Sequence, residues 1–240
     1  MFLSVFDMFK IGIGPSSSHT MGPMVAAKHF RDLLINNNYS GNINSIKITL
    51  FGSLAFTGLA HGSNKGVILG LQGYTPDTIE SDKIEASISD VFKNNKIKIC
   101  SLEEISFNPL KDIKLDTKTK LKQHSNTMEI SASINNNTTI NRTYYSIGGG
   151  FIRVKGERKK FARSIKSPYE FNSCDELIKL CKRNNLKIHE LVLLNEVNSI
   201  AKRELRKKIL HIWNTMDKCI ENGLKNTGIL SGGLNVERRA

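Results

Sequence analysis

Apolar and polar residues alternate along five stretches in the first two thirds of the chain. This two-residue period is typical of β-strands with one buried face. The stretches over 128–134 and 140–144 flank Asn135-Asn136-Asn137, which predicts a hairpin, although the preferred Asn-Gly turn is missing. We therefore expect strands over 45–51, 128–134, 140–144, 96–100 and 103–107.

Other segments place apolar residues three or four positions apart, as amphipathic helices do. In the first part of the chain they predict helices over 21–34, 54–59, from 67 onward, and 77–92. After Ser173 only this period remains, with helices expected over 174–183, 188–208 and 209–222.

The change of period predicts the domain organisation and the fold class. We expect an α/β (α+β) domain with a mixed sheet over residues 1–157. A basic linker follows over 158–172, and an incomplete all-helical segment over 173–240.

The composition is that of an ordinary globular protein. Of 240 residues, 39% are hydrophobic and 24% charged, and no apolar run approaches the roughly 20 residues of a membrane helix. The apolar amino terminus is interrupted by Asp7 and Lys10 and lacks the features of a signal peptide. We expect a cytoplasmic protein that does not bind a membrane.

The net charge of +13 comes from lysines scattered among Asn and Ile, without a basic stripe or a nucleic-acid-binding motif. We therefore expect no nucleic-acid partner, although such a field would attract small anions. The four cysteines predict reduced thiols, mostly buried. The alternative is metal ligation by Cys174 and Cys181, which lie nearly two helical turns apart. The four cysteines of the sequence are Cys100, Cys174, Cys181 and Cys219.

The first candidate site is a run of hydroxyl side chains before the first helix. Unpaired N–H groups at a helix start attract anions, so a carboxylate is a natural ligand there. The alternative is a simple helix cap, which needs only one hydroxyl. The run consists of Ser16, Ser17, Ser18, His19 and Thr20.

Three further loops carry polar groups. His61-Gly62-Ser63-Asn64 interrupts two apolar helical stretches, and its imidazole can move protons near neutral pH. His124-Ser125-Asn126-Thr127 precedes a strand, where a plain turn is the alternative. Tyr145-Ser146-Ile147 runs into Gly148-Gly149-Gly150, which permits close approach of a ligand or acts only as a hinge.

Several segments resemble bacterial iron–sulfur L-serine dehydratases, in the same order along the chain. They are SVFDMFKIGIGPSSSHTMGPMVAA, GSLAFTGLAHGSNKGVILGL, HSNTM, YYSIGGGF and SGGLNVERRA. Ser63-Asn64 departs from the Thr-Asp usual in the family. The resemblance implies conversion of L-serine to pyruvate and ammonia by a carbon–nitrogen lyase. It also implies a [4Fe–4S] cluster that acts as a Lewis acid on the substrate hydroxyl.

The resemblance also implies roles for these loops. We expect His61 to be the base for the α-proton. Ser16, Ser17, Ser18, His19 and Thr20 would hold the carboxylate or orient the hydroxyl. Ser63 and Asn64 would bind L-serine, and His124 and Asn126 would lie on a loop over the site. Ser146, Gly148, Gly149 and Gly150 would supply hydrogen-bond donors.

The family's three cluster cysteines lie in a helical half beyond the segment that matches 228–240, so we expect no metal ligand in this chain. The remainder would be a separate chain, a part lost by truncation, or the rest of a longer protein, and the position of the break favours the last two. We expect an inactive or incomplete enzyme in isolation, and a homodimer by resemblance. The alternative function is a serine-binding regulatory module without catalysis.

Overall fold

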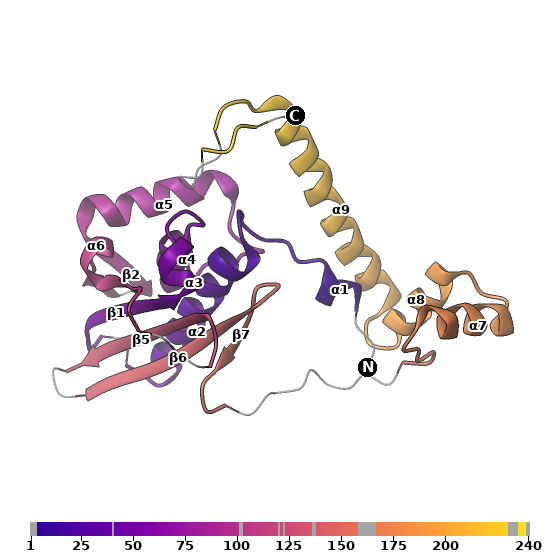
Figure 1. The fold of residues 1–240 in the computed structure, drawn as a ribbon, viewed down its shortest axis with the longest axis horizontal. Coiled ribbons are helices and arrows are strands. Elements are labelled where there is room, and N and C mark those ends of the chain that lie inside the picture. Colours follow the sequence, from indigo (N-terminus) through magenta and orange to yellow (C-terminus); the bar gives the residue numbers. More distant parts are fainter. Residues whose placement is uncertain are drawn as a thin grey trace. The chain divides into compact units, whose positions relative to one another are not determined.

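The computed structural model describes residues 4–39, 41–100, 103–119, 121, 123–135, 138–157, 167–229 and 235–238. These residues fall into two compact units (Figure 1). The sheet unit comprises the described residues within 11–157, together with 228, 229 and 235–238. The helical unit comprises 4–10 together with 167–227.

The sheet unit contains a five-stranded mixed sheet in the order β4-β1-β5-β6-β7. Among the described strands of this sheet, only the β1–β4 pair is parallel. A separate antiparallel pair joins β2 (Lys96–Cys100) to β3 (Glu103–Ser106). The five strands are β1 (Ile43–Gly52), β4 (Ile113–Asp116), β5 (Asn126–Ile134), β6 (Thr138–Gly148) and β7 (Phe151–Val154).

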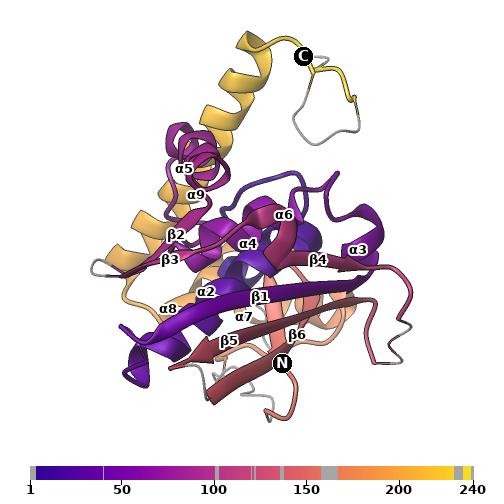
Figure 2. The same cartoon turned by 90° about the vertical axis from the view of Figure 1, so that its left-hand side faces the viewer.

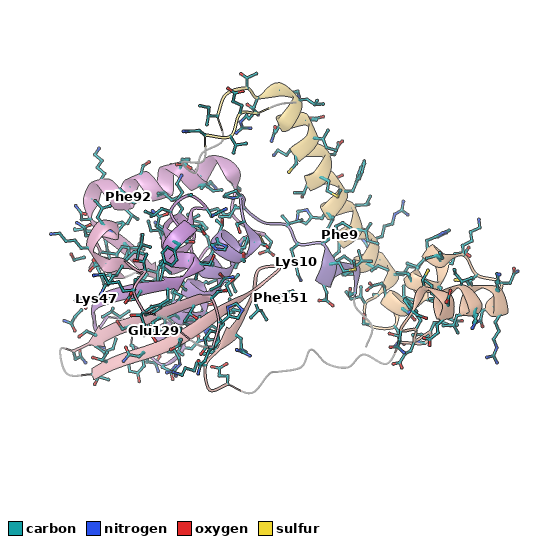
Figure 3. The ribbon with its side chains drawn as sticks, in the orientation of Figure 1. Phe9, Lys10, Lys47, Phe92, Glu129 and Phe151 are labelled. Carbon is teal, nitrogen blue, oxygen red and sulfur yellow. The ribbon has the colours of Figure 1, made fainter. Side chains whose placement is uncertain are left out.

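The two-residue period of β1 and β5 separates a buried face from an exposed one. Ile48 lies opposite Ile130 and Leu50 opposite Met128, and all four side chains are at most 2% exposed. Lys47 and Glu129 belong to the other face and are exposed; both are labelled in Figure 3. The apolar face forms the core together with the helices of the unit.

Two helices carry most of the buried helical surface. They are α2 (Gly22–Asn36), which lies along the sheet in Figure 2, and α4 (Ser63–Leu71). Glycines bring them close: a Cβ at Gly66 would lie 2.4 Å from the Thr20 carbonyl oxygen, and one at Gly70 would lie 2.2 Å from that of Met24. This contact fixes the segment before α2 against the start of α4. The remaining helices are α3 (Ser53–Thr57), α5 (Ser81–Asn94) and α6 (Pro109–Asp112).

The helical unit includes the amino-terminal helix. The buried carboxylate of Glu196 accepts hydrogen bonds from Ser4 Oγ at 2.9 Å and from the Val5 N–H at 2.7 Å. The sequence pattern assigned residues 1–10 to the first domain, whereas these hydrogen bonds connect the start of α1 to α8. The four helices are α1 (Val5–Met8), α7 (Cys174–Asn184), α8 (Ile188–Val197) and α9 (Lys202–Lys225).

The fold class predicted from the sequence, a mixed α/β domain followed by helices, is confirmed. The predicted break between helices at 208/209 is wrong, because α8 ends at Val197 and α9 continues from Lys202 through that position. Ser199 Oγ donates to the Glu196 carbonyl at 2.9 Å, a local bond that competes with the helix. The short strands β4 and β7 were not predicted, and Asn136 and Asn137 of the expected hairpin turn lie outside the described residues.

Candidate functional site around His19 and His61

The hydroxyl-rich segment before α2 forms a wide π-helical turn, Ser17–Met21, which runs directly into the helix. Ser16 Oγ caps it by accepting a hydrogen bond from the His19 N–H at 3.1 Å. One hydroxyl therefore suffices for the cap, and those of Ser18 and Thr20 are directed to other partners. Single π turns inside helices are frequent at functional sites.

His19 lies between two serine hydroxyls. Its Nδ1 is 2.9 Å from Ser18 Oγ, and its Nε2 is 2.9 Å from Ser53 Oγ at the start of α3. Burial of the ring, and next the nearby His61, lower the pKa of His19 below its ordinary value of 6.5, while a hydrogen bond with the backbone of Ser53 opposes this shift. The neutral imidazole is thus the favoured form near neutral pH.

His61 faces His19, with ring centroids 5.1 Å apart and ring planes at 43°. His61 Nδ1 is 2.9 Å from the carbonyl oxygen of Thr57. Because a carbonyl oxygen only accepts, Nδ1 must carry a proton. The neutral ring therefore has its lone pair on Nε2, the arrangement required of a proton acceptor.

Two short hydrogen bonds hold these histidines in place through their backbones. Thr20 Oγ1 donates to the His61 carbonyl at 2.5 Å, and Ser63 Oγ donates to the His19 carbonyl at 2.5 Å. The Ser63 side chain is fully buried. In this geometry Thr20 and Ser63 support the two imidazoles.

The carboxyl end of β6 closes another side of the turn. Ser146 Oγ donates to the Ser18 carbonyl at 2.7 Å. The approach requires glycine at position 22, because a Cβ there would lie 2.0 Å from Ser146 Oγ. Gly148, Gly149 and Gly150 follow with φ of 92°, 59° and 75°, a left-handed turn into β7 that other residues adopt only with strain.

The His124 loop reaches the same end of the sheet. The N–H of Asn126 donates to His124 Nδ1 at 3.0 Å, and Asn126 Nδ2 donates to the Ser146 carbonyl at 3.4 Å. Asn126 Oδ1 is buried and has no hydrogen-bond partner in the described structure. A buried acceptor of this kind is costly unless a ligand or water supplies a donor.

Most of the sequence-predicted residues thus lie in one connected network. Among the described residues, no hydrogen bond joins the side chains of Ser17 or Asn64 to it. Sequence reasoning missed Ser53 and Thr57, although both lie in the GSLAFTG stretch where the strand pattern stops. The connected residues are Ser16, Ser18, His19, Thr20, His61, Ser63, His124, Asn126 and Ser146.

The described residues do not offer a ligand set for an iron–sulfur cluster. Within the described ranges, no three His, Cys, Asp or Glu side chains come together as metal ligands would. The expectation of mostly buried thiols is wrong: only Cys181 is buried, Cys100 is intermediate, and Cys174 and Cys219 are exposed. None of the helices described has both the length and the apolar character needed to cross a bilayer.

This mixed-sheet domain holds two facing imidazoles among hydroxyl and carbonyl groups, which are side chains able to accept and donate protons. The comparison with known families is specific: the chain belongs to the serine dehydratase beta chain family, whose pattern matches residues 4–157.

Curated relatives extend the similarity beyond that match. An L-serine dehydratase of Haemophilus influenzae is 39% identical over 99% of this chain and 53% of its own length. An L-serine dehydratase of Streptomyces coelicolor is 38% identical, covering 100% and 54%. L-serine dehydratase 1 of Escherichia coli is 36% identical, covering 99% and 53%. The chain therefore spans about half the length of the curated relatives it matches.

Proposed function

We propose that this chain supplies the L-serine-binding and proton-accepting half of an L-serine dehydratase. The observation that carries the proposal is the His19–His61 pair, in which His61 has its tautomer fixed by the Thr57 carbonyl. The family and the names of the curated relatives support L-serine as the substrate.

The α-proton of L-serine would pass to Nε2 of His61. A neutral imidazole suits this step because its free ring nitrogen can accept a proton. His19 lies beside it, and its lowered pKa makes it a weaker base than an ordinary histidine. The neutral His19 ring also avoids placing a second positive charge next to the imidazolium that His61 becomes.

The substrate's charged groups would find partners around the π turn. Ser16, Ser17 and Ser18 lie where hydroxyl and backbone donors can meet a carboxylate. The buried, unpartnered Asn126 Oδ1 would accept from the ammonium group. Ser63 and Ser146 would contribute mainly by holding the His19 segment, since their hydroxyls donate to its backbone.

The remaining predicted residues would border the same space. Asn64 is the second residue of α4, directly after Ser63. His124 would approach from its loop over the site, and Gly148, Gly149 and Gly150 would leave room for the substrate at the end of β6. These roles stay predictions.

The overall reaction would be loss of the α-proton and of the β-hydroxyl as water, giving an enamine. The enamine tautomerises to an imine, and water then releases ammonia and pyruvate. The resemblance implies a [4Fe–4S] cluster as the electrophile for the hydroxyl. Since the described residues do not fit that group, we attribute no step to it here and propose that its ligands come from outside this chain. The homodimer and the cytoplasmic location also stay predictions.

Calorimetric titration of the purified 240-residue chain with L-serine tests the proposal. We expect saturable binding of L-serine, and weaker binding of L-alanine and D-serine because the hydroxyl or its placement is lost. Asn126→Asp would test the ammonium contact, and Asn126→Leu should abolish binding by removing the acceptor. Absence of L-serine binding to a folded chain would contradict the substrate-binding role.

The role of His61 needs a turnover assay on anaerobically purified protein, with iron and sulfide measured in the same sample. In a preparation that forms pyruvate, His61→Gln should lower the rate by about 10²- to 10⁴-fold, the contribution of a general base. L-serine affinity should change much less. Normal turnover by His61→Gln would remove this residue from the mechanism, and turnover in the absence of iron would contradict the assignment of the cofactor.

A further inference from the structure

The single-turn helix α3 contacts all three histidine-bearing segments of the site. Ser53 Oγ is bonded to His19 Nε2 at 2.9 Å, and the Thr57 carbonyl accepts from His61 Nδ1 at 2.9 Å. The Ser53 N–H donates to the Ser125 carbonyl at 2.8 Å, within the His124 loop. Thr57 Oγ1 donates to the Ser53 carbonyl at 2.9 Å and so connects the two ends of the turn.

The approach of the His124 loop to this turn depends on glycine at the end of β1. Gly52 has φ of 54°, a value that favours glycine. A Cβ at this position would lie 2.3 Å from the Ser125 carbonyl oxygen. The backbone thus places Ser53 so that its hydroxyl contacts the His19 ring and its N–H contacts the His124 loop.

The two imidazoles are held by chemically different partners. A carbonyl oxygen only accepts, so Thr57 permits a single tautomer of neutral His61. A hydroxyl both donates and accepts, so Ser18 and Ser53 permit either tautomer of His19. Ser16 Oγ lies 3.4 Å from Ser18 Oγ and extends the hydroxyl chain by one member.

We propose that Ser53 is a positioning residue, whose hydroxyl fixes the His19 ring against His61 and sets the balance between the two His19 tautomers. This inference rests on the proposed function only for its catalytic consequence, because the tautomers are properties of the folded chain itself. The lowered pKa of His19 agrees with a ring that stays neutral within this chain of hydroxyls.

The test is a long-range ¹H–¹⁵N spectrum of the full chain with ¹⁵N-labelled histidine, recorded at pH 7.5. His61→Gln and His19→Gln assign the two rings among the six histidines of the sequence. We expect a protonated Nδ1 and a bare Nε2 for His61. Ser53→Ala should change the His19 tautomer ratio by about 3-fold or more, the factor set by one ordinary hydrogen bond, and leave the His61 tautomer unchanged.

Ser53→Thr is the matched control, since it keeps the hydroxyl and should restore the His19 ratio. His29, whose Nδ1 is 3.1 Å from the Tyr144 hydroxyl, reports whether the sheet unit keeps its fold. A His19 ratio that is the same in wild type and in folded Ser53→Ala would overturn the proposal, as would a Thr variant that behaves like Ala.

The unaltered protein gives a result even if Ser53→Ala does not fold. A His19 ring that is doubly protonated at pH 7.5, or that gives the signals of an exposed histidine such as His211, would also overturn the proposal. Calorimetry separates the two ideas: a chain with the expected tautomers that does not bind L-serine contradicts the proposed function and leaves the role of Ser53 intact.

Discussion

Helices α2 and α9 are both amphipathic, but the apolar side of α2 is buried and that of α9 is exposed. The apolar residues of α2 at Met24, Ala27, Phe30 and Leu34 are all 0% exposed. Their counterparts on α9 also lie three or four positions apart and are 43–55% exposed: Ile209, Trp213, Met216 and Ile220. The period determines that a helix has an apolar side, whereas a second surface determines whether that side is buried.

The largest effect that distinguishes the two helices should come from truncating one aromatic side chain in each. Phe30→Ala should lower the free energy of unfolding of the sheet unit by about 3–5 kcal/mol, because it leaves a cavity in a closed core. Trp213→Ala should change the stability of the helical unit by about 0.5 kcal/mol or less.

Hydrogen exchange of peptides from each unit, followed in urea, measures both changes separately. An equal loss of stability in the two variants would mean that the apolar side of α9 is covered in solution. That result would contradict the contrast between α2 and α9.

Glycine replacement tests the same contrast from the backbone side. In Gly66→Ala the new methyl would meet the Thr20 carbonyl oxygen at 2.4 Å, so overpacking should cost about 1–3 kcal/mol. In Gly223→Ala, on α9, nothing lies within 4 Å, and the better helix propensity should add about 0.5–1 kcal/mol. Thermal denaturation followed by circular dichroism should show changes of opposite sign. Destabilisation by both replacements would indicate that α9 is also closely packed at Gly223.

A smaller effect should follow from loosening the attachment of the amino-terminal helix. Glu196→Gln keeps the shape and one acceptor oxygen but loses the charge that strengthens the bonds from Ser4 and Val5. The helical unit should lose about 1 kcal/mol. The fluorescence of Trp213, the one tryptophan of the sequence, reports on this unit. Asp217→Asn is an exposed control on α9 in the same unit, and an equal change there would argue against a specific role for Glu196.

The smallest effect should be a pH dependence confined to the sheet unit. Burial, and next His61, hold the pKa of folded His19 below 6.5, so the unfolded chain binds a proton first as the pH falls. The contribution of His19 to stability is therefore complete above pH 6.5 and decreases as the pH falls toward its folded pKa. Unfolding measured at pH 7.5 and 5.5 should show a smaller difference for His19→Gln than for wild type. An unchanged difference would contradict the lowered pKa.

The elements that follow a clear period were predictable from local sequence. Ile46, Ile48 and Leu50 predicted β1, and Met128 to Tyr144 predicted the β5–β6 hairpin, because each strand buries one face. The four-residue strands β4 and β7 are too short to establish a period. β4 is defined by its hydrogen bonds to β1, which is far away in the sequence. β7 is defined by its hydrogen bonds to β6 across a tight turn.

The candidate site divides in the same way. The histidines were recognisable as polar interruptions of apolar segments. Ser53 was not, because its importance lies in the distance from its hydroxyl to His19 Nε2, across 34 residues of sequence. No pattern within a single segment contains that distance.

The sequence by itself determined the strands and helices that follow a clear period, the fold class, and which loops carry imidazoles and hydroxyls. These properties arise from local backbone preference and from the burial of one side of each element. The tertiary structure alone decided that His61 has its proton on Nδ1, that His19 lies between Ser18 and Ser53, and that Asn126 keeps an unpaired acceptor. Hydrogen bonds act over about 3 Å, and only folding brings residues that are distant along the chain within that reach.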